Sequence, residues 1–150
     1  MKIPLLILED KLQVNSILKC PLFRLYGQVV FIVDTGSPLT MLSEGDALKL
    51  KVPIGNLRDS PIDRKHIYMG GSISEIKLIP KQLDLVFKDD QSKAASVTLP
   101  NICVALSTKH DNRHKQIAQG SPSIMGLDFL RDNGFTLVVD PKKNIAYLEK

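Results

Sequence analysis

The sequence predicts a mostly β fold with one or two short helices, and three observations lead to this prediction. Aromatic residues make up only 5% of the chain and tryptophan is absent, so the core must consist mainly of isoleucine, leucine and valine. β-Branched side chains favour strands over helices. Nine glycines and nine prolines interrupt the apolar segments frequently. Short strands between frequent turns are typical of a sandwich or a barrel, and 150 residues suit a single domain over 1–150.

The N-terminal third predicts three strands, at 3–8, 12–18 and 22–33, the last with a turn or bulge near Gly27. Its final part is continuously apolar, as in a strand buried on both faces. A short helix is expected over 43–50, because Ser43 is a suitable N-cap with Asp46 three residues later.

The middle of the chain predicts a hairpin in which two strand-like segments flank a glycine pair. Further strands and one or two helical turns complete the expected fold. The hairpin strands are expected at 66–69 and 72–79, around Gly70 and Gly71. Further strands are expected at 83–88, 96–106 and 123–125, with a mobile polar loop at 107–120. A helical segment at 127–132 is followed by a closing hairpin of 135–140 and 145–149.

The formal charge of +4 is mildly basic, and no basic stripe with interleaved aromatic residues is visible, so we expect no nucleic-acid partner. The apolar run 3–8 is too short to span a membrane and has no cleavage site after it, so a cytoplasmic protein without a membrane anchor is expected. Cys20 and Cys103 are expected to be buried thiols, although a disulfide between them stays open.

Metal and cofactor sites are not expected. His110 and His114 have a spacing that could present two imidazoles on one helical face, but no third ligand follows and basic residues surround them. A solvated loop explains them better. No Gly-x-Ser-x-Gly segment is present, which argues against a serine hydrolase.

The strongest chemical signal is Phe31-Ile32-Val33-Asp34-Thr35-Gly36-Ser37. It places a carboxylate at the mouth of an apolar strand, where we expect poor solvation. Gly36 allows the backbone to turn closely behind Asp34, and the hydroxyls of Thr35 and Ser37 could orient the carboxylate. Taken alone, the same residues could be an Asx turn without a catalytic role.

A second segment, Ile124-Met125-Gly126-Leu127-Asp128-Phe129-Leu130, follows much later, with the glycine-tipped hairpin between the two. In this order the three features resemble the retropepsin-like aspartic peptidases, over most of the chain from about Phe23 to Leu148. The resemblance implies a closed β-barrel of retropepsin type with a flap hairpin. Only one Asp-Thr-Gly is present, which implies an aspartic endopeptidase that works as a homodimer on a peptide or protein substrate.

The resemblance also implies the role of each site residue. Asp34 would be catalytic, Thr35 would bond across the dimer axis, Gly36 would contact substrate, and Ser37 would hydrogen-bond the carboxylate. The other implied positions are Met69, Gly70 and Gly71 at the flap tip, Tyr68 either as a flap aromatic or as an ordinary hairpin residue, and Ile32, Ile124, Gly126 and Leu127 as packing around the active-site loops.

Two positions depart from the retroviral pattern. Pro38 and Leu127 stand where retroviral enzymes carry an acidic residue and an arginine, so both members of that ion pair are missing. This puts a retroviral style of dimer interface in doubt, and the two ends of the chain could supply the interface instead. The alternative function is a retropepsin-fold module that binds peptides or dimerises without catalysis.

Overall fold

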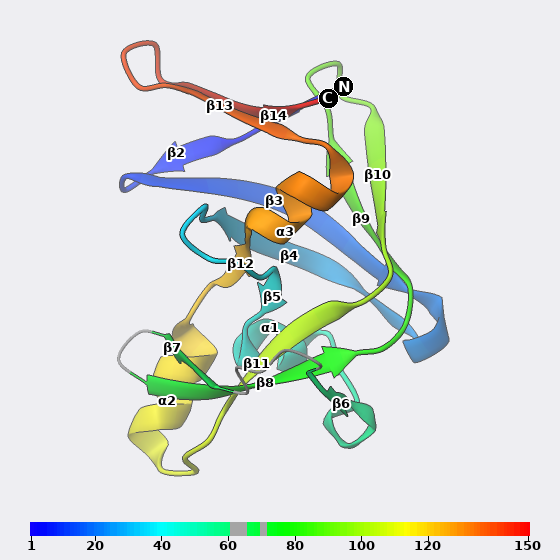
Figure 1. The fold of residues 1–150 in the computed structure, drawn as a ribbon, viewed down its shortest axis with the longest axis vertical. Coiled ribbons are helices and arrows are strands. Elements are labelled where there is room, and N and C mark those ends of the chain that lie inside the picture. Colours follow the sequence, from blue (N-terminus) through cyan, green and yellow to red (C-terminus); the bar gives the residue numbers. More distant parts are fainter. Residues whose placement is uncertain (61–65, 70–71) are drawn as a thin grey trace.

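The structure is a computed structural model that describes residues 1–60, 66–69 and 72–150. It is mostly β with few helices, as the sequence predicts (Figure 1). The strands are β1 (Lys2–Pro4), β2 (Leu6–Leu8), β3 (Lys11–Cys20), β4 (Leu25–Val33), β5 (Met41–Leu42), β6 (Arg58–Asp59), β7 (His66–Met69), β8 (Ser72–Ile79), β9 (Leu83–Lys88), β10 (Ala94–Leu99), β11 (Ile102–Ser107), β12 (Ser123–Met125), β13 (Thr136–Asp140) and β14 (Ile145–Glu149). The helices are α1 (Glu44–Lys49), α2 (Asn112–Gly120) and α3 (Leu127–Asn133), with 3-10 turns η1 (Pro21–Phe23) and η2 (Ile54–Asn56).

The strands form two sheets. The larger runs in the order β10-β9-β3-β4-β12-β5-β11-β8-β6, with β2 added to β3 and β7 added to β8, and the smaller is β1-β14-β13. Among the described residues, the end strands β10 and β6 each pair with one neighbour and not with each other. The closed barrel therefore stays a prediction.

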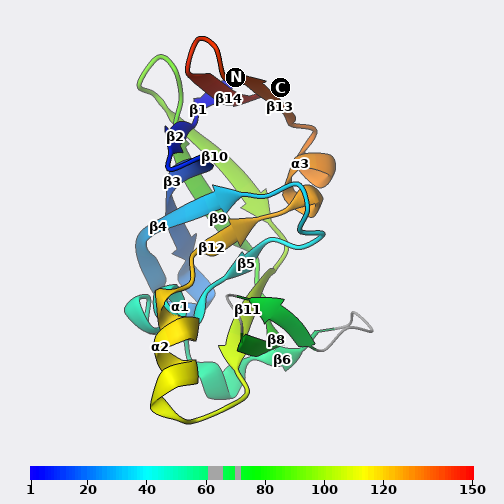
Figure 2. The ribbon, with the colours of Figure 1, turned by 90° about the vertical axis from the view of Figure 1, so that its left-hand side faces the viewer.

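Three neighbouring strands, β4, β12 and β5, bring the two motif segments together (Figure 2). β12 pairs in parallel with the end of β4, so that Ile124 lies opposite Ile32 and Met125 opposite Val33. On its other side, β12 pairs with β5 at Ile124 and Met41. A parallel pair needs a long connection between its strands, and here the connection includes β7, β8 and α2.

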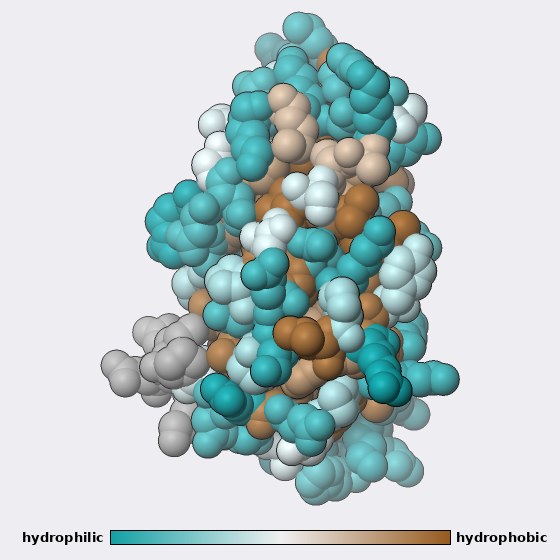
Figure 3. Space-filling view, turned by 90° about the vertical axis from the view of Figure 1, so that its right-hand side faces the viewer, coloured by the Kyte–Doolittle hydropathy of each residue, from teal (hydrophilic) through white to brown (hydrophobic). Residues whose placement is uncertain are grey.

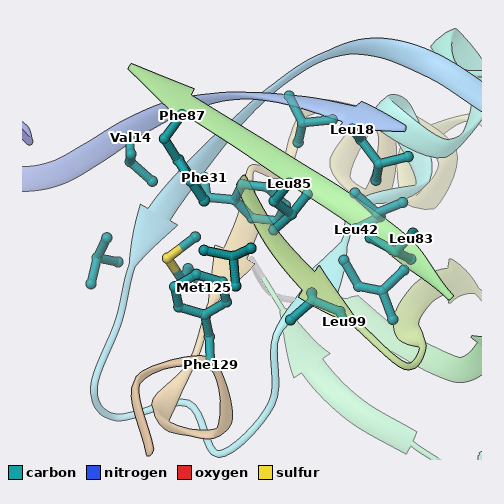
Figure 4. Close-up of a cluster of buried hydrophobic side chains, with 14 of the residues drawn as sticks. Val14, Leu18, Phe31, Leu42, Leu83, Leu85, Phe87, Leu99, Met125 and Phe129 are labelled. Carbon is teal, nitrogen blue, oxygen red and sulfur yellow. The ribbon is translucent and has the colours of Figure 1, made fainter. Parts of the chain in front are cut away.

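The main core lies between β3, β4, β9 and α3 (Figure 4). Phe129 of α3 stacks on Phe135 with ring centroids 5.5 Å apart and meets Phe87 edge-on at 6.0 Å. Burial of one such side chain contributes about 1.5–3 kcal/mol. α3 is thus anchored by its apolar side, which fixes the position of Gly126 immediately before it. A second, smaller cluster of Met41, Ile76, Cys103 and Ala105 lies apart from this core, with Leu39, Ile67, Leu78 and Ile124 packed against it.

The strand predicted at 22–33 begins later, at Leu25, because Pro21 opens a 3-10 turn that ends at Arg24 with φ of 53°. The predicted bulge near Gly27 is wrong, since Gly27 pairs regularly with Leu18. A Cβ on Gly27 would lie 2.6 Å from the Leu50 side chain, so this glycine makes room for packing.

Two further segments differ from the prediction. The single strand predicted at 96–106 is two strands, β10 and β11, broken at Pro100, which lacks a backbone donor. The loop predicted at 107–120 contains helix α2, whose N-cap Asp111 accepts a hydrogen bond from the His114 backbone. α2 buries Ala118 and contacts α1, β8 and β11, and this tertiary contact overrides its polar composition.

Several local predictions are confirmed. Ser43 caps α1 by accepting a hydrogen bond from the Asp46 backbone, although the Asp46 carboxylate accepts from the Ser123 hydroxyl at 2.6 Å instead of closing a capping box. Cys20 and Cys103 are free and buried.

No helix in the described part of the chain is long and apolar enough to cross a membrane.

Candidate active site

The turn after β4 presents the Asp34 carboxylate. The Asp34 amide donates to the Met125 carbonyl at 3.0 Å, which joins the end of β4 to the end of β12. The Gly36 amide donates to Asp34 Oδ1 at 2.8 Å, and the Ser37 amide donates to the Asp34 carbonyl at 3.1 Å. The Asx turn is therefore present. Among the residues that the structure describes, Asp34 Oδ2 has no hydrogen-bond partner, so it is free to contact a water or a second carboxylate.

Helix α3 holds the far side of this turn. The Leu127 amide donates to the Ser37 carbonyl at 2.9 Å. A Cβ on Gly126 would lie 2.5 Å from the Leu39 carbonyl oxygen and 2.8 Å from that of Ser37. Only glycine fits this close approach of two backbones, which explains the residue type that the sequence motif requires.

Thr40 and Asp128 also link the two segments, and the sequence prediction missed this link. The buried Thr40 hydroxyl donates to Asp128 Oδ1 at 2.6 Å, and the Thr40 amide donates to Oδ2 at 3.0 Å. The Gly126 amide donates to the Thr40 hydroxyl at 3.0 Å. This network joins the two segments at the place where Pro38 and Leu127 lack the retroviral ion pair. The only signal in the sequence was an acidic residue within the second motif.

A cavity of about 290 Å³ lies beside Asp34. It is lined by Asp34, Gly36, Ser37, Pro38, Leu39, Met41, Ile67, Tyr68 and Ile124. Ile67 and Tyr68 come from β7, so this strand of the predicted flap and the carboxylate border one space. Tyr68 is 82% exposed, which leaves its ring free to contact a ligand.

Other predicted residues lie elsewhere. Leu127 is 45% exposed and does not line this cavity. Ile32 lines a separate groove with Val30 and residues of α1. Gly70 and Gly71 lie outside the described residues, and Met69 is placed only as the last residue of β7.

Three expectations are corrected. Asp34 is exposed in the single chain, because the turn that carries it projects beyond the end of β4. The end of β4 is also not buried on both faces as predicted, since Val30 is 37% exposed while Phe31 and Val33 are buried.

The Ser37 hydroxyl donates to the Leu39 carbonyl at 2.9 Å and not to the carboxylate, because Ser37 itself forms a local turn across Pro38. Thr35 is also exposed, so it is accessible to a partner.

No cluster of three or more potential metal ligands occurs in the described ranges. His114 Nδ1 lies 2.6 Å from the Asp111 carboxylate at the start of α2, and His110 precedes that helix. Burial, together with the nearby Asp128 charge, raises the pKa of the Cys103 thiol to about 11. The thiol is therefore protonated at neutral pH and is no nucleophile.

Among the comparisons with known proteins, the one with solved structures shows the fold. No protein-family model matches the chain, and no curated protein matches it. The crystal structure of a retropepsin-like aspartic protease from Rickettsia conorii is similar, with a TM-score of 0.56 over 99% of this chain and 89% of that one. The fold is retropepsin-like. Because the two sequences are 18% identical, this similarity establishes the fold alone.

Proposed function

We propose that the chain is an aspartic endopeptidase that acts as a homodimer, with Asp34 as the catalytic carboxylate of each subunit. One observation carries the proposal. In a retropepsin-like fold, an exposed carboxylate with a free oxygen borders the same cavity as the flap strand.

The proposed reaction requires a second copy of the chain. The sequence holds one Asp-Thr-Gly, and one carboxylate cannot act as both base and acid in the same step. A two-fold axis beside the turn would set Asp34 of one subunit against Asp34 of the other. Exposure of Asp34 and Thr35 in the single chain supports this, because both side chains are accessible to a partner.

The proposed mechanism is general acid–base catalysis. Two carboxylates in contact share one proton, a property for which aspartic proteases are the standard example. The ionised carboxylate takes a proton from a bound water, which attacks the scissile carbonyl. The protonated carboxylate polarises that carbonyl and later protonates the leaving amine. No covalent intermediate with the protein forms.

The cavity suggests the substrate. Leu39, Met41, Ile67 and Ile124 give it an apolar lining next to the carboxylate. We infer that it accepts an apolar side chain of an extended peptide, whose backbone pairs with the flap. Polar side chains would lose their hydration there without gaining partners.

The test is cleavage of a peptide library by the purified chain from acidic to neutral pH, read by mass spectrometry. We expect cleavage beside apolar residues by the wild type and none by Asp34→Asn. The exposed Asp90→Asn variant serves as the matched control and should cleave normally. Cleavage that persists in Asp34→Asn would refute the proposal, and peptide binding indifferent to Asp34 without cleavage would indicate a binding module.

A further inference from the structure

The outer face of the sheet formed by β9, β3 and β4 carries apolar side chains that face solvent. Alternate residues of these strands point away from the core, and three of the outward ones are apolar and exposed: Ile17 at 36%, Val30 at 37% and Tyr26 at 69%. Val86 of β9 lies opposite Ile17 and is half-buried. The solvent face of an antiparallel sheet is normally polar. Burial of these side chains under another layer would therefore be favourable.

A cavity of about 530 Å³, the outer groove, lies on this face of the sheet. It is lined by Asn15, Ser16, Ile17, Tyr26, Gln28, Val86, Phe87, Lys88, Ser92, Lys93 and Ala94. None of these residues borders the cavity beside Asp34. Figure 3 views the molecule from the side on which β9 and β10 lie in Figure 1, and hydrophobic residues are visible there among hydrophilic ones. The outer groove is therefore separate from the candidate active site.

The charge of the outer groove is positive. Lys88 and Lys93 line it and are exposed, and no acidic residue is among its lining residues. Within the described residues neither lysine has an ion-pair partner. The nearby Asp89 carboxylate accepts hydrogen bonds from the Gln91 and Lys93 amides, so the turn already engages it. Charge complementarity therefore favours a ligand that carries carboxylates next to its apolar side chains.

The strands below the groove already use their backbone groups within the sheet. β3 pairs with β4 on one side and with β9 on the other, and β9 also pairs with β10. An extended segment laid on this face would leave its own amides and carbonyls without partners against Ile17 and Val86. An α-helix satisfies its backbone internally and can present a stripe of apolar side chains. The outer groove therefore suits a helix, as in folds that pack helices on a sheet.

We propose that the outer groove binds an amphipathic helix of a partner protein, whose apolar stripe covers Ile17, Tyr26 and Val86 and whose carboxylates meet Lys88 and Lys93. Lys88 follows Val86 by two residues, about 7 Å along the strand. One helical turn rises by about 5.4 Å, so the helix needs an acidic residue three or four positions from an apolar one. A second copy of the chain fits less well, because its own groove would bring the same lysines and no carboxylate.

The test uses a fluorescein-labelled helical peptide with leucines along one face and glutamates one turn away, added to the full-length Asp34→Asn variant so that no cleavage intervenes. We expect saturable binding by fluorescence anisotropy. The double variant Lys88→Glu/Lys93→Glu should weaken binding roughly tenfold, because it sets like charges against the glutamates. The matched double variant Lys115→Glu/Lys142→Glu carries the same charge change at exposed positions outside the groove and should bind normally.

Two further comparisons test the apolar floor and the helix. Ile17→Asn should also weaken binding, because it places an amide under the apolar stripe. Ile145→Asn is the matched control, at a position that is 46% exposed in β14, outside the groove, and it should bind normally. The same peptide with a central proline cannot complete its helix and should not bind, whereas an extended ligand would tolerate the proline.

Footprinting with hydroxyl radicals locates the peptide. The peptide should protect Tyr26 and leave Tyr68 reactive, which is 82% exposed at the cavity beside Asp34. Sedimentation of Ile17→Asn should match that of the wild type, since the groove is not a contact between copies. Absence of binding, equal binding by the Lys88/Lys93 double variant, tolerance of the proline, protection of Tyr68 instead of Tyr26, or altered sedimentation would overturn the proposal. None of these readouts requires peptidase activity.

Discussion

Thr40 is a single residue that joins two segments far apart in the sequence. Its hydroxyl donates to Asp128 and accepts from the Gly126 amide, so one buried oxygen binds two groups at the start of α3. Removal of that oxygen would leave the buried Gly126 amide without its partner, and Asp128 Oδ1 would keep only the hydrogen bond from the Phe129 amide at 2.7 Å. A buried amide without a partner costs more than the average hydrogen bond contributes.

Thr40→Val should therefore lower the free energy of unfolding by about 1–3 kcal/mol, because the change keeps the shape but removes the hydroxyl. Urea denaturation measures this. Thr98→Val is the matched control, since the Thr98 hydroxyl also donates to a carboxylate, that of Asp84 at 2.6 Å, but on the exposed surface. The control should change stability by less than about 0.5 kcal/mol. Equal losses in the two variants would contradict the role of the buried network.

Gly126→Ala should be more damaging, because the new methyl group would meet backbone and not a movable side chain. We expect a loss of roughly 1–3 kcal/mol or more, with displacement of the Asp34 turn. Gly120→Ala provides the comparison, since nothing lies within 4 Å of a Cβ there. That variant should be as stable as the wild type or slightly more so, which thermal unfolding would check.

At the scale of elements, α2 depends on its first turn. Asp111 accepts hydrogen bonds from the His114 backbone at 3.0 Å and from its ring at 2.6 Å. The bond from the His114 backbone amide, followed by that from the ring, lowers the pKa of Asp111 below its ordinary value of 3.8. The folded state therefore prefers the ionised carboxylate, and its contribution to stability is present above that ordinary value.

The contribution of Asp111 should disappear as the pH falls through its lowered folded-state pKa. Asp111→Asn retains a capping side chain but cannot titrate. We expect the wild type to be more stable than this variant at neutral pH and equally stable at strongly acidic pH. Denaturation of both proteins across this range, with the Asp111 carboxyl followed by NMR, tests the sign. A difference that grows on acidification would be inconsistent with it.

For the whole molecule, the proposed site exists only where two chains meet. Addition of excess Asp34→Asn protein to a fixed amount of wild type should therefore suppress peptidase activity, because the mixed dimers hold one catalytic carboxylate. Excess Asp90→Asn protein should not suppress it. Sedimentation should show a dimer at concentrations where the wild type is active. Full activity in the presence of excess Asp34→Asn would rule out a shared site.

Much of the fold could be predicted from local patterns. Turn residues and apolar runs located most strands, and Ser43 marked the start of α1, because these signals act over a few neighbouring residues. The pattern failed at α2, where a polar segment becomes helical through its cap and its contacts with α1, β8 and β11. It also failed at Gly27, whose partner Leu50 is not a sequence neighbour.

The sequence by itself determined that one carboxylate follows an apolar strand and that a glycine precedes a short apolar helix. Only the tertiary structure decided that Thr40 and Asp128 fasten these segments, that Tyr68 borders the same cavity as Asp34, and that Asp34 is exposed in one chain. The physical reason is the separation along the chain of the residues that interact. Turn and strand preferences arise within a few residues, whereas hydrogen bonds, cavities and solvent exposure depend on which distant segments the fold brings together.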